Sequence, residues 1–191
     1  MLKEAKIASL VPLFPAPQYV VVLEDVDKTR LVPIWIGISE GNAIALEMQG
    51  EKFPRPLTHD LMVGFLKVLK AEIQKIIISD LRENSYYAII VIKSGDATYE
   101  VDARPSDSLA LAVRVKCPIY IDEKVLKKCP LISGAITAAE IERFKEELKT
   151  LTPEQFFKDL TEATPAPEPE IFPGSEAEGE PGEDEDDPEE L

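Results

Sequence analysis

The order of its strand-like segments restricts this chain more than any other feature does. Apolar, β-branched runs predict two sets of three strands, over 6–11, 18–24 and 30–37, and over 75–81, 86–93 and 97–103. A helix is expected after each set, beginning with a capping serine at Ser39 and at Ser106. Three strands followed by a helix, twice over, predict an α+β domain with a mixed or antiparallel sheet packed by helices.

The two sets also agree at the level of residues. SEGNAIA (39–45) and SDSLALA (106–112) share a serine, an acidic residue and an alanine–aliphatic–alanine ending, at an offset of 67 positions. Together with the shared order, this favours an internal duplication of a β-β-β-α unit. A duplicated unit tends to bring equivalent helix N-termini to related places. The polar residues at the two helix starts are therefore candidates for a functional role.

Further helices are expected outside the two sets. One runs from about Thr58 to Lys70, capped by Thr58, with Leu61, Phe65 and Leu69 on one face. A short strand is expected over 118–121.

Two amphipathic helices are expected near the C-terminus, over 136–161. A capping box marks the start of each helix: Thr137 with Glu140 in the first, and Thr152 with Gln155 in the second. The second helix carries the apolar residues Phe156, Phe157 and Leu160, which either complete the core or meet a partner chain. The sequence leaves both readings open.

Charge separates the last 30 residues from the rest of the chain. The chain holds 36 acidic and 21 basic residues, and 13 of the acidic ones but no Lys or Arg lie in 162–191. The remaining 23 acidic against 21 basic residues give a nearly neutral body. The Pro- and Glu-rich tail cannot bury enough apolar surface to offset its ordering entropy, which predicts disorder. We therefore expect an α+β domain over 1–135, helices over 136–161 and a disordered acidic tail over 162–191.

The sequence also bears on location. No apolar run reaches the roughly 20 residues that a membrane span needs, so no membrane partner is expected. The N-terminal segment has charges and prolines where a signal peptide needs an unbroken apolar stretch. The two cysteines, Cys117 and Cys129, have no metal-binding spacing. These features predict a cytoplasmic protein with reduced thiols.

The stretch PRPLTHD (54–60) holds the only histidine of the chain. Two prolines keep Arg55 extended, and Thr58 followed by His59 and Asp60 begins a helix. Helix capping accounts for Thr58 and Asp60 without any function. It does not account for His59 or for the arginine, and a helix N-terminus beside an arginine is a natural anion site.

The stretch DARPSD (102–107) likewise places an arginine and acidic residues at a helix start. Asp102 and Arg104 alternate at a strand end and are expected on one face, while Pro105 and Ser106 begin a helix with Asp107 in its first turn. Carboxylates beside an anion site can hold a divalent cation. Together with PRPLTHD, these residues suit the handling of a phosphate ester, with histidine for a proton. They equally suit a structural network of ion pairs, and residue chemistry alone leaves the choice open.

Three longer blocks of the sequence resemble the signature segments of a known protein family. VPIWIGISEGNAIAL (32–46), FPRPLTHDL (53–61) and VDARPSDSLALAVRVKCPIYI (101–121) resemble the signature blocks of the bifunctional nuclease domain family, over roughly 6–122. The resemblance implies an α+β domain that forms homodimers or larger homo-oligomers and cleaves both RNA and DNA. The acidic tail lies outside it.

The family blocks map onto nine candidate residues of this chain, and the roles given to them are our hypotheses. His59, Asp60, Asp102 and Asp107 are the candidate catalytic residues; Arg55, Thr58, Arg104 and Ser106 would bind the substrate phosphate; Glu40, Asp102 and Asp107 would hold Mg²⁺ or Mn²⁺.

The first hypothesis is accordingly a nuclease acting on RNA or DNA. The second is a non-catalytic homo-oligomeric binding or regulatory module whose polar clusters are structural. The third is a sensor of a small phosphate ligand. No RNA-binding signature or aromatic stacking platform is evident in the sequence.

Overall fold

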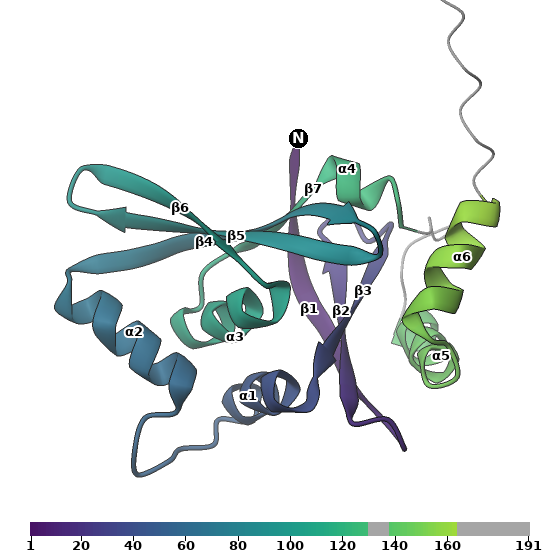
Figure 1. The fold of residues 1–191 in the computed structure, drawn as a ribbon, viewed down its shortest axis with the longest axis horizontal. Coiled ribbons are helices and arrows are strands. Elements are labelled where there is room, and N and C mark those ends of the chain that lie inside the picture. Colours follow the sequence, from purple (N-terminus) through teal and green to yellow (C-terminus); the bar gives the residue numbers. More distant parts are fainter. Residues whose placement is uncertain (130–137, 164–191) are drawn as a thin grey trace, which may run out of the picture.

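The computed structural model describes residues 1–129 and 138–163, and the two C-terminal helices lie beside the domain formed by the rest (Figure 1). The strands are β1 (Leu2–Leu13), β2 (Gln18–Asp25), β3 (Leu31–Gly37), β4 (Ala71–Arg82), β5 (Ser85–Ser94), β6 (Ala97–Ala103) and β7 (Ile119–Asp122). The helices are α1 (Ile38–Met48), α2 (Thr58–Val68), α3 (Pro105–Val115), α4 (Glu123–Leu126), α5 (Ala138–Leu148) and α6 (Pro153–Ala163). The α+β class predicted from the sequence is confirmed.

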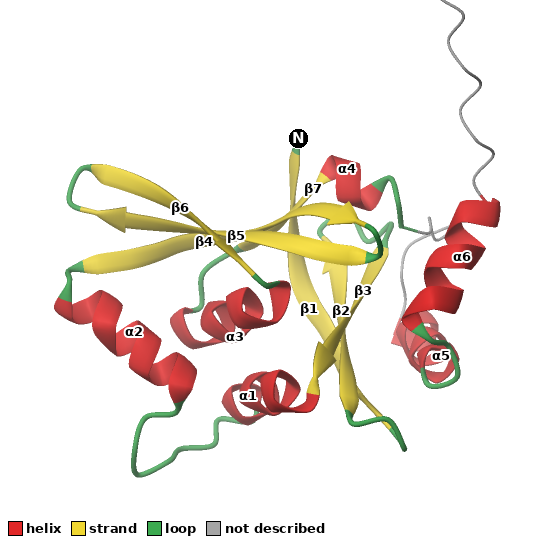
Figure 2. Ribbon diagram, in the orientation of Figure 1, coloured by secondary structure: helices red, strands yellow, loops and turns green. Residues whose placement is uncertain are grey.

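The described strands form one mixed sheet in the order β3-β2-β1-β7-β4-β5-β6. Two antiparallel three-stranded units flank β7, which pairs antiparallel with β1 and parallel with β4. Each unit leads into a helix, α1 or α3, and these two helices pack together on the same side of the sheet (Figure 2). The element order therefore repeats as predicted, while duplication as its origin stays a prediction.

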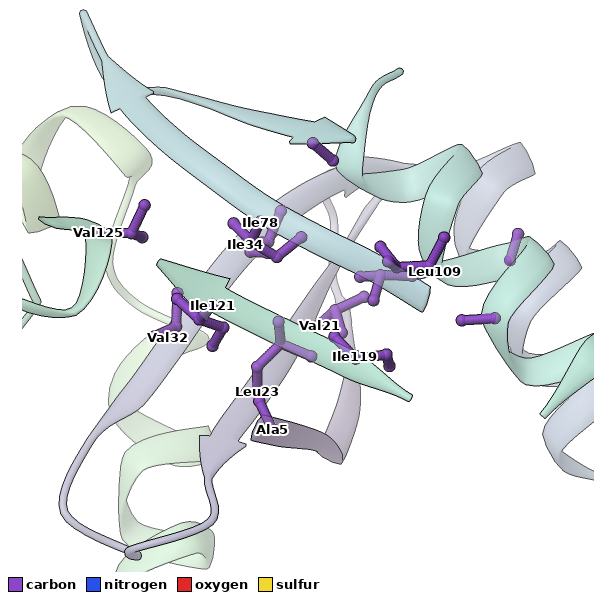
Figure 3. Packing of buried hydrophobic residues seen from close by; sticks show 14 of the residues in the cluster. Ala5, Val21, Leu23, Val32, Ile34, Ile78, Leu109, Ile119, Ile121 and Val125 are labelled. Atoms are coloured by element: carbon purple, nitrogen blue, oxygen red, sulfur yellow. The ribbon is translucent and has the colours of Figure 1, made fainter. Parts of the chain in front are cut away.

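Strand β2 is buried on both faces, which explains its unbroken apolar run. Val21 and Leu23 face the main core with α1 and α3, whereas Val20 and Val22 face α5 on the other side. All four side chains are fully buried. Figure 3 shows part of the main core, where Val21 and Leu23 lie near Ile119 and other side chains of the sheet. The alternation typical of a half-exposed strand is absent because neither face of β2 meets water.

The C-terminal helices complete the structure of the domain. The predicted capping box of α6 is confirmed, since the Thr152 N–H donates to Gln155 Oε1 and the Gln155 N–H donates to Thr152 Oγ1. Phe156 and Phe157 are buried against Trp35, so of the two readings left open they complete the core. The side chain of Leu160, the capping residue Thr137 and the tail beyond 163 lie outside the description, and α6 runs two residues into the predicted tail.

The helix starts differ from the prediction in one respect. Ser39, Thr58 and Ser106 are not caps, because the helices begin earlier and the N-cap residues are Gly37, Leu57 and Arg104. In α3, Pro105 suits the first helical position, which places the cap before it.

A common feature replaces the expected serine and threonine caps. Each of these three helices has an acidic residue at its third position, Glu40, Asp60 or Asp107, where a carboxylate meets the positive end of the helix.

Helix α2 exposes apolar surface. Leu61, Phe65 and Leu69 share a face as predicted, and that face is 48%, 58% and 69% exposed at these residues. The core-facing side is made by Val63 and Leu66 instead. Within the described residues, no helix combines the length and apolar character needed to cross a bilayer.

Candidate functional site

Ionic contacts join the first turns of α1, α2 and α3. Arg104, the N-cap of α3, donates from Nε to Asp107 Oδ2 at 2.7 Å and from Nη2 to Asp107 Oδ1 at 3.2 Å. Its Nη2 also lies 3.2 Å from Oε1 of Glu40 on α1. One guanidinium therefore links the third residues of two helices, which are 67 positions apart in the sequence. We call Glu40, His59, Arg104 and Asp107 the ionic cluster.

His59 brings the third helix into the ionic cluster. Its Nε2 lies 3.4 Å from Oδ1 of Asp107, and the imidazole is 8% exposed. Burial raises the pKa of the Asp107 carboxyl, but the hydrogen bonds from Arg104 and His59 outweigh it, so the net pKa is lowered. The same contacts raise the pKa of Arg104, with the hydrogen bond to Asp107 as the main cause. Asp107 is therefore ionised and fixed near neutral pH.

A cavity of about 610 Å³ lies over the ionic cluster. All four cluster residues line it, together with Thr58 and Met62 of α2. The Arg104 side chain is 67% exposed, so a ligand can reach the guanidinium even though two carboxylates already contact it. A histidine fixed by a carboxylate beside an accessible arginine is an arrangement that can move a proton near an anion.

Asp60 belongs to a different set of contacts. Its Oδ2 accepts from the Leu57 N–H at 2.9 Å and its Oδ1 accepts from Arg114 Nε at 2.6 Å. Burial raises the pKa of Asp60, but the hydrogen bonds from Arg114 and Leu57 lower it by more. Arg114 also donates to the carbonyls of Ala43 and Ala110. Arg114 of α3 thus contacts Asp60 on α2 and the carbonyl of Ala43 on α1, so the Asp60–Arg114 pair connects all three helices.

The remaining candidates are placed apart from the ionic cluster. Arg55 and Asp102 are exposed, and neither side chain has a hydrogen bond or ion pair with any residue in 1–129 or 138–158. Strand β6 ends at Ala103 and Arg104 is the extended N-cap of α3, so the shared face expected for Asp102 and Arg104 stays a prediction. Thr58 lines the cavity from the first position of α2, and Ser106 is buried at the second position of α3.

Sequence reasoning missed Arg114, although its position offered a signal. The helix sequence PSDSLALAVRV is apolar after its first turn, and Arg114 is the one cation in it. Its side chain is only 6% exposed. A charged residue on a buried helix needs a partner, which points to an acidic residue on a neighbouring element.

Among the described residues, no ready-made ligand set for a divalent cation is present at the ionic cluster. No three His, Cys, Asp or Glu side chains among them converge as ligands. Of the three predicted ligands, Glu40 and Asp107 have the Arg104 guanidinium between them, and Asp102 lies apart on β6. The binding of Mg²⁺ or Mn²⁺ therefore stays a prediction.

The fold and the ionic cluster define an α+β domain with an acid–histidine–arginine site at three helix starts. Residues 21–133 match the model of the bifunctional nuclease domain, and the chain belongs to this family. An uncharacterized protein of Mycobacterium tuberculosis (strain H37Rv) is 41% identical over 151 residues, covering 74% of this chain and 90% of the relative. Bifunctional nuclease 1 of Oryza sativa subsp. japonica is 22% identical over 114 residues, covering 58% of this chain and 34% of the rice protein.

Proposed function

We propose that this chain is a nuclease that hydrolyses phosphodiester bonds of RNA or DNA at the ionic cluster. The observation that carries the proposal is the contact between His59 and Asp107 beside the accessible guanidinium of Arg104. Membership of the bifunctional nuclease domain family supports it, as does the printed name of the rice relative. Histidine supplies proton transfer near neutral pH, and arginine recognises phosphate oxygens.

Separate roles are proposed for the members of the ionic cluster. With Nε2 of His59 donating to Asp107, the second ring nitrogen is left to accept a proton from an attacking water or hydroxyl. Arg104 would hold a non-bridging oxygen of the scissile phosphate. Glu40 would orient Arg104 from the opposite side to Asp107.

Electrostatics set a condition on this chemistry. Two carboxylates face one guanidinium, so the ionic cluster carries excess negative charge while His59 is neutral. A phosphate approaching the cluster is repelled unless a cation joins it or a carboxylate moves away from Arg104. Dependence on Mg²⁺ or Mn²⁺ is proposed on this ground.

The first experiment measures cleavage of labelled single-stranded RNA and DNA with Mg²⁺, Mn²⁺ or EDTA. Loss of a general base lowers the rate by about 100- to 10,000-fold, so His59→Ala should reduce cleavage by that factor. Asp107→Asn should also reduce it, whereas Asp96→Asn, in the exposed turn before β6, is the matched carboxylate control. Cleavage that is unchanged in His59→Ala would overturn the proposed site, and a folded wild type without cleavage would overturn the proposed function.

A second candidate function is a non-catalytic homo-oligomeric module. The exposed apolar face of α2 favours it, because a contiguous apolar patch of this kind is typical of an interaction surface. The contacts between charged residues at the three helix starts would then be structural. Homo-oligomerisation is compatible with both functions and is proposed for both.

We also propose a cytoplasmic location. Both cysteines in the chain are free and lie in the described part, Cys129 buried and Cys117 half-buried. Burial raises the pKa of the Cys129 thiol to about 11 and raises that of Cys117 as well. Thiols of this kind are unreactive and suit a reducing compartment.

A further inference from the structure

A second cavity adjoins the ionic cluster on the side away from α2. It has a volume of about 360 Å³, which is within the size range of small-molecule sites. Glu40 and Arg104 line both this cavity and the larger one over the cluster. The two cavities are thus neighbours that share the guanidinium, and a ligand anchored on Arg104 can extend into either.

Three aromatic residues from distant parts of the sequence line the second cavity: Trp35 on β3, Tyr86 on β5 and Phe157 on α6. The ring of Phe157 lies 6.2 Å from that of Trp35 and 6.0 Å from that of Tyr86, centroid to centroid, in tilted arrangements. We call these three side chains the aromatic wall. The fold thus brings together an aromatic cluster that was not evident in the sequence.

The aromatic wall also holds an unused hydrogen-bond donor. The Nε1 atom of Trp35 is buried and has no partner among the described residues. An indole N–H can only donate, and buried donors are nearly always paired. Because this atom is shielded from solvent, a ligand in the cavity would contact the rings and Arg104 rather than the indole N–H.

Aromatic side chains beside an arginine are the means by which proteins hold unpaired nucleotides, with the base against the rings and the phosphate on the cation. We propose that the second cavity is a base subsite, which binds the nucleoside next to the phosphate held by Arg104. This proposal rests on the proposed nuclease function and specifies its substrate as single-stranded nucleic acid. A base within a duplex is stacked and paired, and it cannot reach the aromatic wall without being flipped out.

Helix α6 gives the subsite an element from outside the matched family domain. Phe157 and Pro153 line the cavity from α6, and this helix lies beyond the residues 21–133 that match the family model. The remaining lining comes from within the matched region. Substrate preference would therefore depend on the C-terminal helix, while the ionic cluster belongs to the family domain.

The single tryptophan of the chain makes the test direct. Titration of the full-length protein with a nucleoside monophosphate, followed by Trp35 fluorescence with excitation beyond nucleobase absorption, should show saturable change. Inorganic phosphate and the free nucleoside should each bind more weakly than the monophosphate, since each makes only part of the contacts. Base–aromatic stacking corresponds to about a 5- to 100-fold change in affinity, which is the expected loss in Phe157→Leu.

A matched control lies one residue away. Phe156 is as buried as Phe157, and its ring lies 5.4 Å from that of Trp35, but it does not line the cavity. Phe156→Leu should change the fluorescence of the free protein and leave the affinity for the monophosphate unaltered. Equal loss in both variants, or no saturable binding by the wild type, would overturn the subsite.

The outcome for the subsite can be separated from that for the nuclease. Monophosphate binding that depends on Phe157, in a protein without cleavage, would retain a nucleotide site and reject the catalytic function. Cleavage that needs His59 but is equally efficient in Phe157→Leu and Phe156→Leu would retain the nuclease and reject the subsite.

Discussion

Arg104 is the residue on which the two cavities, the two carboxylates and the proposed phosphate contact all converge. Its guanidinium already contacts Asp107 through two nitrogens and Glu40 through one. A phosphate bound there has to share these donors or replace a carboxylate. Asp107 holds the guanidinium through two hydrogen bonds and Glu40 through a single 3.2 Å contact, so the Glu40 contact is the easier one to exchange. The more buried His59–Asp107 contact would then stay in place while a ligand binds.

Asp60 gives a residue-scale prediction about pH. The pKa of Asp60 is lowered from the ordinary value of 3.8, so its contribution to stability is complete above that value and is lost as pH falls through the lowered pKa. Asp60→Asn should reduce the free energy of unfolding by about 1–3 kcal/mol near neutral pH, because Arg114 loses its anionic partner. The difference from wild type should shrink below about pH 4.

Urea denaturation of both proteins at several pH values measures this difference. Asp96→Asn, a change in an exposed turn, serves as the control and should match wild type throughout. A gap between Asp60→Asn and wild type that stays constant into the acid range would show that the carboxylate charge is not what stabilises Arg114.

At the scale of elements, two glycines on different helices give opposite predictions. A Cβ on Gly41 of α1 would collide with the ring of Tyr19 on β2, whereas a Cβ on Gly64 of α2 would meet nothing within 4 Å. Gly41→Ala should therefore destabilise the protein by about 1–3 kcal/mol through overpacking. Gly64→Ala should stabilise it by up to about 1 kcal/mol, since alanine favours the helix.

Thermal unfolding of the two variants side by side measures both effects. The shared substitution removes helix propensity as an explanation for any difference between them. If Gly41→Ala were as stable as Gly64→Ala, α1 could not be held against β2 by the close approach at Tyr19.

The strands and helices of this chain could largely be predicted from the sequence, because β-branched runs and turn residues mark them directly. The observed β1 and β4 are longer than predicted, since backbone pairing extends beyond the apolar runs into segments where polar and apolar residues are mixed. Helix α4 was not predicted from the sequence, because it has only four residues. Serine or threonine was predicted to cap α1, α2 and α3, but none of them does. In α2 the third residue, Asp60, accepts a hydrogen bond from the Leu57 N–H instead.

The candidate site could be predicted only in part. The offset of 67 between Glu40 and Asp107 indicated that their helix starts would be related, and both do contact Arg104. The aromatic wall could not be anticipated, because its members are separated by 51 and 71 positions and meet only through the packing of α6 on the sheet. Contacts of this range depend on the tertiary fold, and no local pattern encodes them.

Within the described part of the molecule, a large apolar face is uncovered on the helix that also bears His59. Its members on α2 are 39% to 80% exposed: Leu61, Met62, Phe65, Val68 and Leu69. Met62 belongs to this face and also lines the cavity over the ionic cluster. A second copy of the chain bound to this face would therefore lie at the edge of the site.

The homo-oligomer proposed for this protein can be tested through that face. Light scattering should find a dimer or larger species for wild type, and Phe65→Glu should shift it to monomer, because a charge at the centre of an apolar interface is costly to bury. Phe14→Glu is the control, since Phe14 is 85% exposed in the turn between β1 and β2, away from α2. A monomeric wild type, or an oligomer that Phe65→Glu does not change, would contradict an interface at α2.

Cleavage by the Phe65→Glu monomer would show that one chain contains the whole site. Loss of cleavage in a folded Phe65→Glu monomer would mean that the partner copy completes the cavity beside Met62.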